Sequence, residues 1–159
     1  MGTRYVVVLV AEGVIPERES LVCQAWGEVP ISYFQDHESL NECSFIDLKV
    51  NKWEINAEWS RKSEVEPWIR IEILRGGAVA EYLVAQGLSL VVEGGALLSI
   101  EMDDDGGEID EILLVNLVSV FMPGNRVFQW RGGLSEIDGE YISRFPAREE
   151  VLERLRHCR

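Results

Sequence analysis

Apolar and polar side chains alternate along Trp68–Leu74, and this alternation is the clearest structural pattern in the chain. Three isoleucines at every second position fall on one face, whereas Trp68, Arg70 and Glu72 fall on the other. Successive side chains of a β-strand point to opposite faces of the sheet. The period of two therefore predicts a strand whose isoleucine face belongs to the core.

Similar patterns predict strands on both sides of this one. Tyr5–Val10 is an apolar run rich in valine, which is typical of a strand buried on both faces. Ser44–Trp59 alternates as well, but its phase changes at Asn51-Lys52, so we expect two strands joined there by a bulge or a tight turn. Val29–Phe34 and Arg126–Arg131 are predicted as further short extended segments.

Leu88–Glu93 and Ala96–Met102 are two apolar segments separated by glycines, which is the pattern of a β-hairpin. A three-residue loop, Glu93-Gly94-Gly95, places most of their apolar side chains on one face, whereas a two-residue turn mixes the faces. We therefore predict this loop, with Gly95 in the left-handed conformation that a bulged turn requires.

Ile112–Met122 is apolar at both odd and even positions. Its Ile and Val content and the Pro123-Gly124-Asn125 turn that follows favour a central strand. A buried helix is the alternative, because Glu108, Asp110 and Glu111 would suit the first turn of a helix.

Three segments have the composition of helices. Residues 16–26 begin at a proline and end before Gly27, Ala78–Gln86 ends before Gly87, and Pro146–His157 has arginines near its C-terminus. Gln35–Ser44 and Glu136–Glu140 are predicted loops. Together these elements predict an α+β fold in one globular domain, 1–159. We expect a mixed, mostly antiparallel sheet of about six to eight strands with two to three short helices, including a C-terminal helix.

Charge and cysteine content exclude several classes of protein. The 159 residues carry a formal net charge of −13, which would repel the phosphate backbone of a nucleic acid. No apolar run reaches the roughly 18–20 residues that span a bilayer, so no membrane association is predicted. Three cysteines without a paired spacing fit reduced thiols, and we expect a cytoplasmic protein.

The negative charge is concentrated in residues 76–125, which hold nine carboxylates and neither Lys nor Arg. Residues 101–106 match the start of a calcium-binding loop, including the glycine at its sixth position. The match then fails, because Ile109 arrives one residue late and Ile112 stands where the loop needs its last carboxylate. We therefore predict a solvated acidic turn without metal or cofactor; a divalent-cation site is the alternative.

No motif predicts a catalytic residue. The sequence lacks the phosphate-binding glycine loops, the nucleophile elbow and the zinc-binding helix motif. Cys23 and His37 could form a nucleophile–base pair. However, Cys23 beside Leu21 and Val22 suits a core thiol, and His37 between two acids suits the surface.

The five tryptophans divide into two groups. Trp53 and Trp59 share a predicted strand face and are expected in the core. Trp68 instead shares its face with Arg70, a combination typical of binding hot spots. A helix that covers this face and buries Trp68 is the structure we favour, because large aromatic side chains are mostly buried.

These observations favour an acidic, non-catalytic binding protein, such as an inhibitor or immunity protein that neutralises a basic partner protein, for example a toxin. The alternative is a small enzyme, or a metal- or small-ligand-binding protein, with a site built from dispersed residues. The oligomeric state is left open. The candidate partner-binding residues are Glu101, Asp103, Asp104, Asp105, Glu108, Asp110, Glu111, Trp68 and Arg70.

Overall fold

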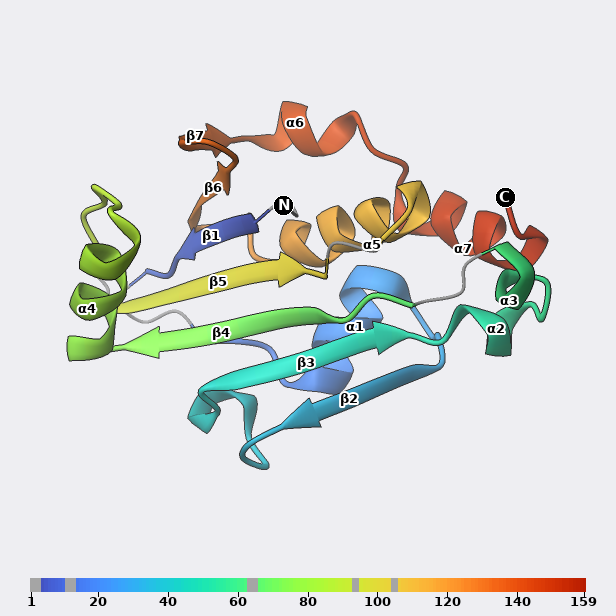
Figure 1. The fold of residues 1–159 in the computed structure, drawn as a ribbon, viewed down its shortest axis with the longest axis horizontal. Helices are drawn as coiled ribbons and strands as arrows, with labels where there is room; N and C mark the ends of the chain where they lie inside the picture. The colour runs from blue at the N-terminus through green and yellow to red at the C-terminus, as the bar shows by residue number, and fades with distance from the viewer. Residues whose placement is uncertain (1–3, 11–13, 63–65, 93–94, 104–105) are drawn as a thin grey trace.

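The computed structural model describes residues 4–10, 14–62, 66–92, 95–103 and 106–159. Within these residues, seven strands form one sheet in the order β2-β3-β4-β5-β1-β6-β7, and every neighbouring pair is antiparallel (Figure 1). The strands are β1 (Arg4–Val8), β2 (Ile31–Gln35), β3 (Phe45–Val50), β4 (Ile69–Arg75), β5 (Ala96–Met102), β6 (Arg126–Trp130) and β7 (Leu134–Ile137).

Helices are more numerous than the two to three that the sequence predicts. They are α1 (Arg18–Trp26), α2 (Lys52–Ile55), α3 (Trp59–Lys62), α4 (Gly77–Gln86), α5 (Glu108–Ser119), α6 (Gly139–Ser143) and α7 (Arg148–His157), with a 3-10 turn, η1 (Leu40–Glu42). The additional ones are α5, which stands where a strand was predicted, and the short helices α2, α3 and α6, of four or five residues each. The predicted α+β class, its mostly antiparallel sheet and its C-terminal helix are confirmed.

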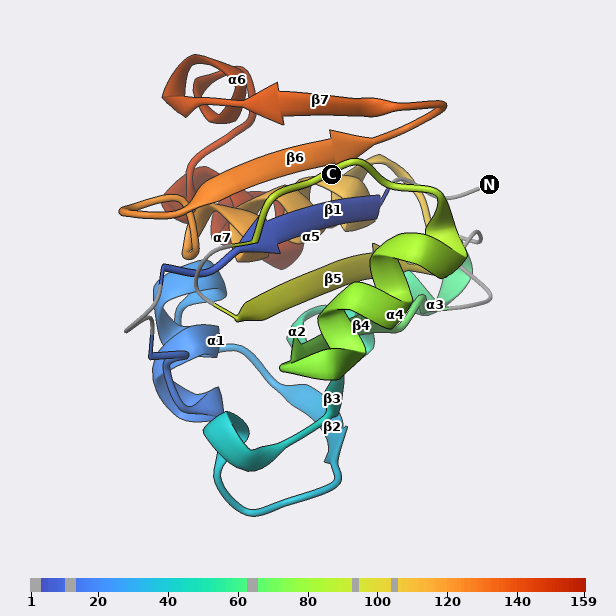
Figure 2. The same cartoon turned by 90° about the vertical axis from the view of Figure 1, so that its left-hand side faces the viewer.

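The sheet is covered unequally on its two faces. Figure 2 shows α1, α5 and α7 on one side of the sheet and α4 on the other. The main core lies between the sheet and the three helices, and the isoleucines of β4 are buried there, as their alternation predicts. A smaller cluster lies under α4, where Val79 and Tyr82 pack near Leu97 of β5. Among the described residues, no helix is long and apolar enough to span a membrane.

The segment 112–122 forms most of α5, so the predicted strand is wrong and the buried helix is correct. Of the twelve residues of α5, nine are buried. Because the helix has almost no solvent-exposed side, its sequence lacks the polar positions that would have indicated a helical period. Asp110 accepts a hydrogen bond from the backbone N–H of Gly107 at the helix start, at 2.9 Å. Trp26 of α1 donates its indole N–H to the carbonyl of Leu113, which joins α1 to α5.

The second strand predicted within Ser44–Trp59 is also wrong. The chain turns after Val50, where the alternation changes phase, and continues as the short helices α2 and α3. Trp59 is buried as expected and donates its indole N–H to the carbonyl of Leu155 in α7, at 2.8 Å. Trp53 is 53% exposed, contrary to the prediction.

The predicted hairpin of Leu88–Glu93 with Ala96–Met102 is not formed. Both edges of β5 are occupied, by β1 and by β4, and residues 88–92 form no strand. Leu90 and Val92 pack against the cluster under α4 instead. Gly95 has the predicted positive φ, +71°, whereas residues 93 and 94 lie outside the described part of the chain. The predicted loop Glu136–Glu140 is wrong as well, because it holds the end of β7 and the start of α6.

Candidate functional site

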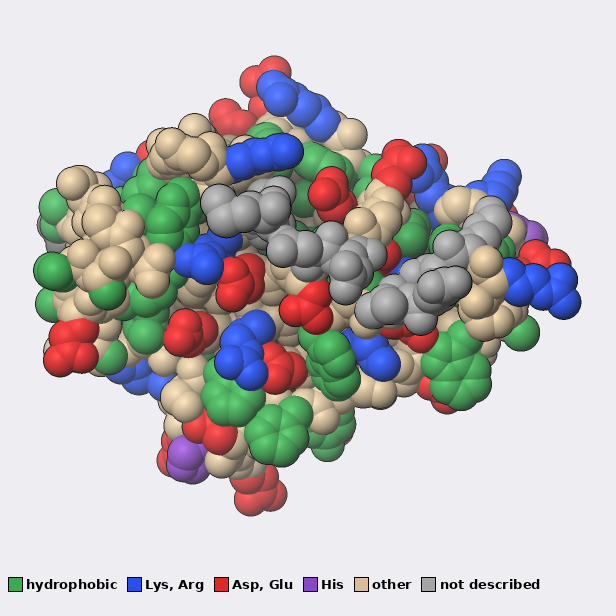
Figure 3. Space-filling view, in the orientation of Figure 1, with side chains coloured by type: hydrophobic (Ala, Val, Ile, Leu, Met, Phe, Trp, Pro, Cys, Tyr) green, Lys and Arg blue, Asp and Glu red, His purple; other side chains and the backbone are tan. Residues whose placement is uncertain are grey.

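Among the described residues, no helix covers part of one sheet face over strands β2 to β5. We call this region the open face: the side of these strands that points away from α1, α5 and α7. Figure 3 shows aromatic side chains among red and blue charged ones over β2, β3 and β4. The helix that we expected to cover Trp68 is not present there in the described part of the chain, and Trp68 is 36% exposed.

Asp47 and Arg70 form the central ion pair of the open face. The register of β3 and β4 places them directly opposite each other, while their neighbours Ile46 and Ile71 point into the core. The guanidinium donates two hydrogen bonds to the two carboxylate oxygens, at 2.8 and 2.9 Å. These bonds raise the pKa of Arg70 above its usual value.

Aromatic rings surround this pair. Phe34, which is 60% exposed on β2, stacks on Phe45 of β3 with ring centres 5.8 Å apart. The guanidinium of Arg70 lies over the Phe45 ring, 4.6 Å from its centre. The ammonium group of Lys49 lies 5.1 Å from the ring centre of Trp68. The open face therefore already holds two cations against aromatic rings, which is a favourable arrangement for positive charge.

The end of β5 adds two carboxylates. Glu101 accepts hydrogen bonds from Nε and Nη2 of Arg4 through one oxygen, Oε2, at 2.9 and 2.8 Å. Asp103 accepts from the backbone N–H of Trp68 at 3.1 Å and donates its own N–H to the Trp68 carbonyl at 3.0 Å. This exchange fixes Asp103 beside the start of β4. Oε1 of Glu101 and Oδ1 of Asp103 make no hydrogen bond with the described residues.

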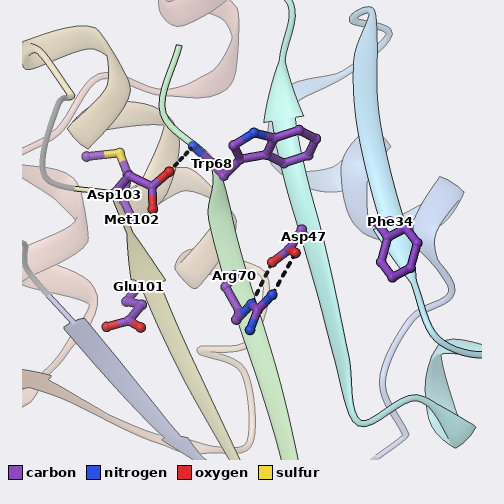
Figure 4. A pocket seen from close by; sticks show the side chains of 7 residues that line it. All are labelled: Phe34, Asp47, Trp68, Arg70, Glu101, Met102 and Asp103. Carbon is purple, nitrogen blue, oxygen red and sulfur yellow. Dashed lines mark hydrogen bonds and ion pairs between the residues drawn. The ribbon is translucent and has the colours of Figure 1, made fainter. Parts of the chain in front are cut away.

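These groups line a shallow cavity of about 580 Å³, which we call the hollow (Figure 4). Three carboxylates and one guanidinium line it, so its formal charge is negative. Two of its walls are aromatic, and two carboxylate oxygens, Oε1 of Glu101 and Oδ1 of Asp103, have no hydrogen-bond partner among the described residues. The lining residues are Phe34, Asp47, Trp68, Arg70, Glu101, Met102 and Asp103.

The structure brings together four of the nine residues predicted for partner binding: Trp68, Arg70, Glu101 and Asp103. The sequence analysis missed Phe34 and Asp47. Asp47 alternates with the buried Ile46 and Leu48, which marked it as facing away from the core, whereas the sequence of β2 shows no such alternation around Phe34. What the sequence does not show is that β2 pairs with β3 and β3 with β4.

The other predicted residues lie elsewhere. Asp104 and Asp105 are outside the described part of the chain. Glu108 and Glu111 begin α5 in the helical layer, where they line a second cavity with Arg144 and Arg154. Asp110 is buried and forms an ion pair with Lys52 at 2.7 Å. The acidic sequence 101–111 therefore does not form one continuous surface.

The remaining reactive side chains are separate from the hollow. Cys23 is exposed, so the predicted core thiol is wrong there, whereas His37 lies at the surface as expected. Cys43, not Cys23, lies next to His37; its thiol donates to the His37 carbonyl at 3.2 Å. Within the described ranges, no cluster of three or more His, Cys, Asp or Glu side chains could hold a metal ion.

No protein-family model matches the chain, and neither a curated protein nor a solved structure matches it.

Proposed function

We propose that this chain is a non-catalytic binding protein whose hollow takes a Lys or Arg side chain from a basic partner protein. The supporting observation is the convergence of three carboxylates and two exposed aromatic rings around one cavity of about 580 Å³. A cation in such a cavity is attracted by the carboxylates and by the faces of the rings at once. An inhibitor or immunity protein that neutralises a basic toxin is the kind of protein that fits this site.

The net charge of −13 supports the same proposal at long range. A strongly negative protein attracts a positive partner and accelerates their encounter, and added salt weakens this effect. The hollow then supplies specificity, because a planar guanidinium can bond to a carboxylate and stack on an aromatic ring simultaneously. The Arg70–Asp47 pair shows this combination within the chain itself, since Arg70 bonds to Asp47 and lies over Phe45.

The experiment is capture of a partner from the native host by the immobilised chain, followed by titration with the purified partner. Trp68→Ala removes one wall of the hollow, and Trp53→Ala is its matched control on α2, where the indole is 53% exposed. We expect a basic partner, about 30-fold weaker binding for Trp68→Ala, as for a hot-spot residue, and less than about 2-fold change for Trp53→Ala. Far-UV circular dichroism and melting curves of both variants show that they are folded.

Charge is tested separately. Asp103→Asn and Glu81→Gln each remove one negative charge, but Glu81 lies at an exposed position on α4 and not in the hollow. We expect Asp103→Asn to weaken binding by more than Glu81→Gln, and raising salt from about 50 to about 200 mM to slow association of all variants. An acidic partner, or equal binding by Trp68→Ala and Trp53→Ala, contradicts the proposal.

A further inference from the structure

Strand β2 is an end strand of the sheet and lacks the charged residue, the proline and the bulge that commonly protect such an edge. Its sequence, Ile31–Gln35, contains no charged residue and no proline. End strands commonly carry Lys, Pro or a bulge, because their unpaired backbone groups can pair with another chain. In Figure 1, β2 is the outermost strand, and no helix of the described residues lies beyond it.

The opposite edge is different. Strand β7 has four residues, and its Glu136 forms an ion pair with Arg126 of β6 at 2.8 Å. Helix α6 follows directly and contacts β7. Strand β7 therefore carries a charged residue and is followed by a helix that contacts it, whereas β2, which is one residue longer, contains no charged residue.

The backbone of β2 presents a row of unpaired groups. The N–H of Asn51 donates to the carbonyl of Pro30 at 2.9 Å, and the register pairs Ile31 with Val50. In an antiparallel ladder, every second residue bonds to the neighbouring strand. Ser32 and Phe34 therefore bond towards β3, and the N–H and C=O groups of Ile31, Tyr33 and Gln35 point away from the sheet. In the described part of the chain, no hydrogen bond satisfies these outward groups.

Aromatic rings flank this edge on both faces. Phe34 lies on the open face at the margin of the hollow. Tyr33 is 48% exposed on the other face, where the guanidinium of Arg18 lies 3.6 Å from its ring centre. Arg18 also donates to the side chain of Gln35 at 2.8 Å, which holds this arrangement in place. A strand beside β2 would bury part of both rings.

Acidic residues lie around the same edge. Glu19 and Glu28 line a cavity together with Arg18 and Ile31, at one end of β2, so two carboxylates and one guanidinium lie there. Asp36 and Glu38 follow the other end of the strand. These charges, and the net charge of −13, oppose pairing with a second copy of this chain and favour a cationic segment.

We propose that the basic partner binds by strand addition: an extended cationic segment pairs with β2 through the backbone groups of Ile31, Tyr33 and Gln35. This inference rests on the proposed function and names how the partner binds. Neighbouring strands lie about 4.8 Å apart, so alternate side chains of the added strand fall beside Phe34 on the open face. A Lys or Arg at such a position extends over Phe34 towards the hollow. Backbone pairing then supplies affinity, and the hollow selects for positive charge.

The probe is an acetylated, amidated octapeptide of alternating Lys and Val. N-methylation at the lysines leaves the N–H and C=O groups of the valines free to pair with β2. In an antiparallel arrangement the lysine side chains then lie on the face of Phe34, and the methylated edge of the peptide cannot pair with a second peptide. The control peptide is N-methylated at every residue, so it keeps the same side chains and charge without a free edge. Two-dimensional ¹H–¹⁵N spectra and amide hydrogen exchange report on the protein.

We expect the first peptide to shift the amide signals of Ile31, Tyr33 and Gln35 and to slow their exchange at least about 10-fold, because these N–H groups become hydrogen-bonded. The fully methylated peptide should do neither. Tyr33→Pro removes an outward N–H without removing a bond to β3, and Tyr33→Ala is its matched control, since both variants lose the ring. Binding of the first peptide should weaken at least about 10-fold for Tyr33→Pro relative to Tyr33→Ala.

Several results overturn the inference. Equal binding of both peptides, with unchanged exchange in β2, rules out strand addition and leaves the proposed function intact. Absence of binding by either peptide also overturns it, while capture of a partner by wild type and not by Trp68→Ala still supports the function. Self-association in sedimentation equilibrium that Tyr33→Pro abolishes would identify a second copy as the occupant of this edge.

Discussion

The Nζ atom of Lys52 lies 2.7 Å from Oδ1 of Asp110, and both side chains are almost completely buried. The other carboxylate oxygen, Oδ2, accepts the backbone N–H of Gly107, so Asp110 serves the ion pair and the start of α5 together. The ammonium group also lies 5.4 Å from the ring centre of Trp59. Two segments 58 positions apart are joined by this pair, which connects α2 to the helical layer.

We predict that Asp110→Asn destabilises the protein by about 3–5 kcal/mol, because it leaves the charge of Lys52 buried without a counter-charge. Urea unfolding followed by circular dichroism measures this difference. Glu111→Gln is the matched control: it lies in the same helical turn but is exposed, and should change the free energy of unfolding by less than about 0.5 kcal/mol.

The double variant Lys52→Met/Asp110→Leu tests the cause of this loss. Removing both charges replaces the pair by apolar side chains of similar size, so most of the stability lost in Asp110→Asn should return. A loss below about 1 kcal/mol for Asp110→Asn, or a double variant less stable than the single one, contradicts the assignment of the loss to an unpaired buried charge.

The sequence predicts those elements of the fold whose two sides have different surroundings. The isoleucines of β4 face the core and Arg70 faces outward, so their alternation is visible in the sequence. Helix α5 is surrounded by protein, and its apolar residues therefore show neither a period of two nor a period of 3.6. Strand β5 lies between β1 and β4, and these pairings join segments that are distant in the sequence. The sequence shows only the local pattern, in which Gly94 and Gly95 separate two apolar segments, and this pattern suggested a hairpin.

The candidate site was predictable to a similar extent. Alternation placed Trp68 and Arg70 on the outward face of their strand, and the acidic sequence pointed to Glu101 and Asp103. Charge along the sequence could not distinguish Glu101, which faces outward on β5, from Asp110, which lies nine residues later and is buried in the first turn of α5. Only the register of β3 with β4 brings Asp47 opposite Arg70.

Cys23 should be the thiol that reacts in the native protein. Cys23 is exposed, whereas Cys43 and Cys158 are buried. Burial raises the pKa of the Cys43 thiol, which also donates to the carbonyls of His37 and Ser39. A thiol-reactive chromophore should therefore modify about one cysteine per chain rapidly, and Cys23→Ser should remove this phase. Denaturation in urea should expose all three thiols; rapid native modification of Cys43 in the Cys23→Ser variant contradicts the expectation.

Acid should weaken the loop between β2 and β3, because its backbone donates hydrogen bonds to the charged carboxylates of Asp36, within the loop, and of Glu17, before α1. Hydrogen bonds from Ser44 hold the pKa of Asp36 well below its ordinary value near 3.8, and the backbone N–H of Leu40 lowers the pKa of Glu17. A lowered pKa means that protons bind more tightly to the unfolded chain, so this stabilisation is present above about pH 4 and is lost as the pH falls towards the folded-state values.

We expect Asp36→Asn to be less stable than wild type at pH 7 and to lose less stability between about pH 5 and pH 2, with Glu81→Gln as the exposed control on α4. Urea unfolding at each pH measures these free energies. Parallel pH profiles for wild type and Asp36→Asn would mean that Asp36 does not carry the acid sensitivity.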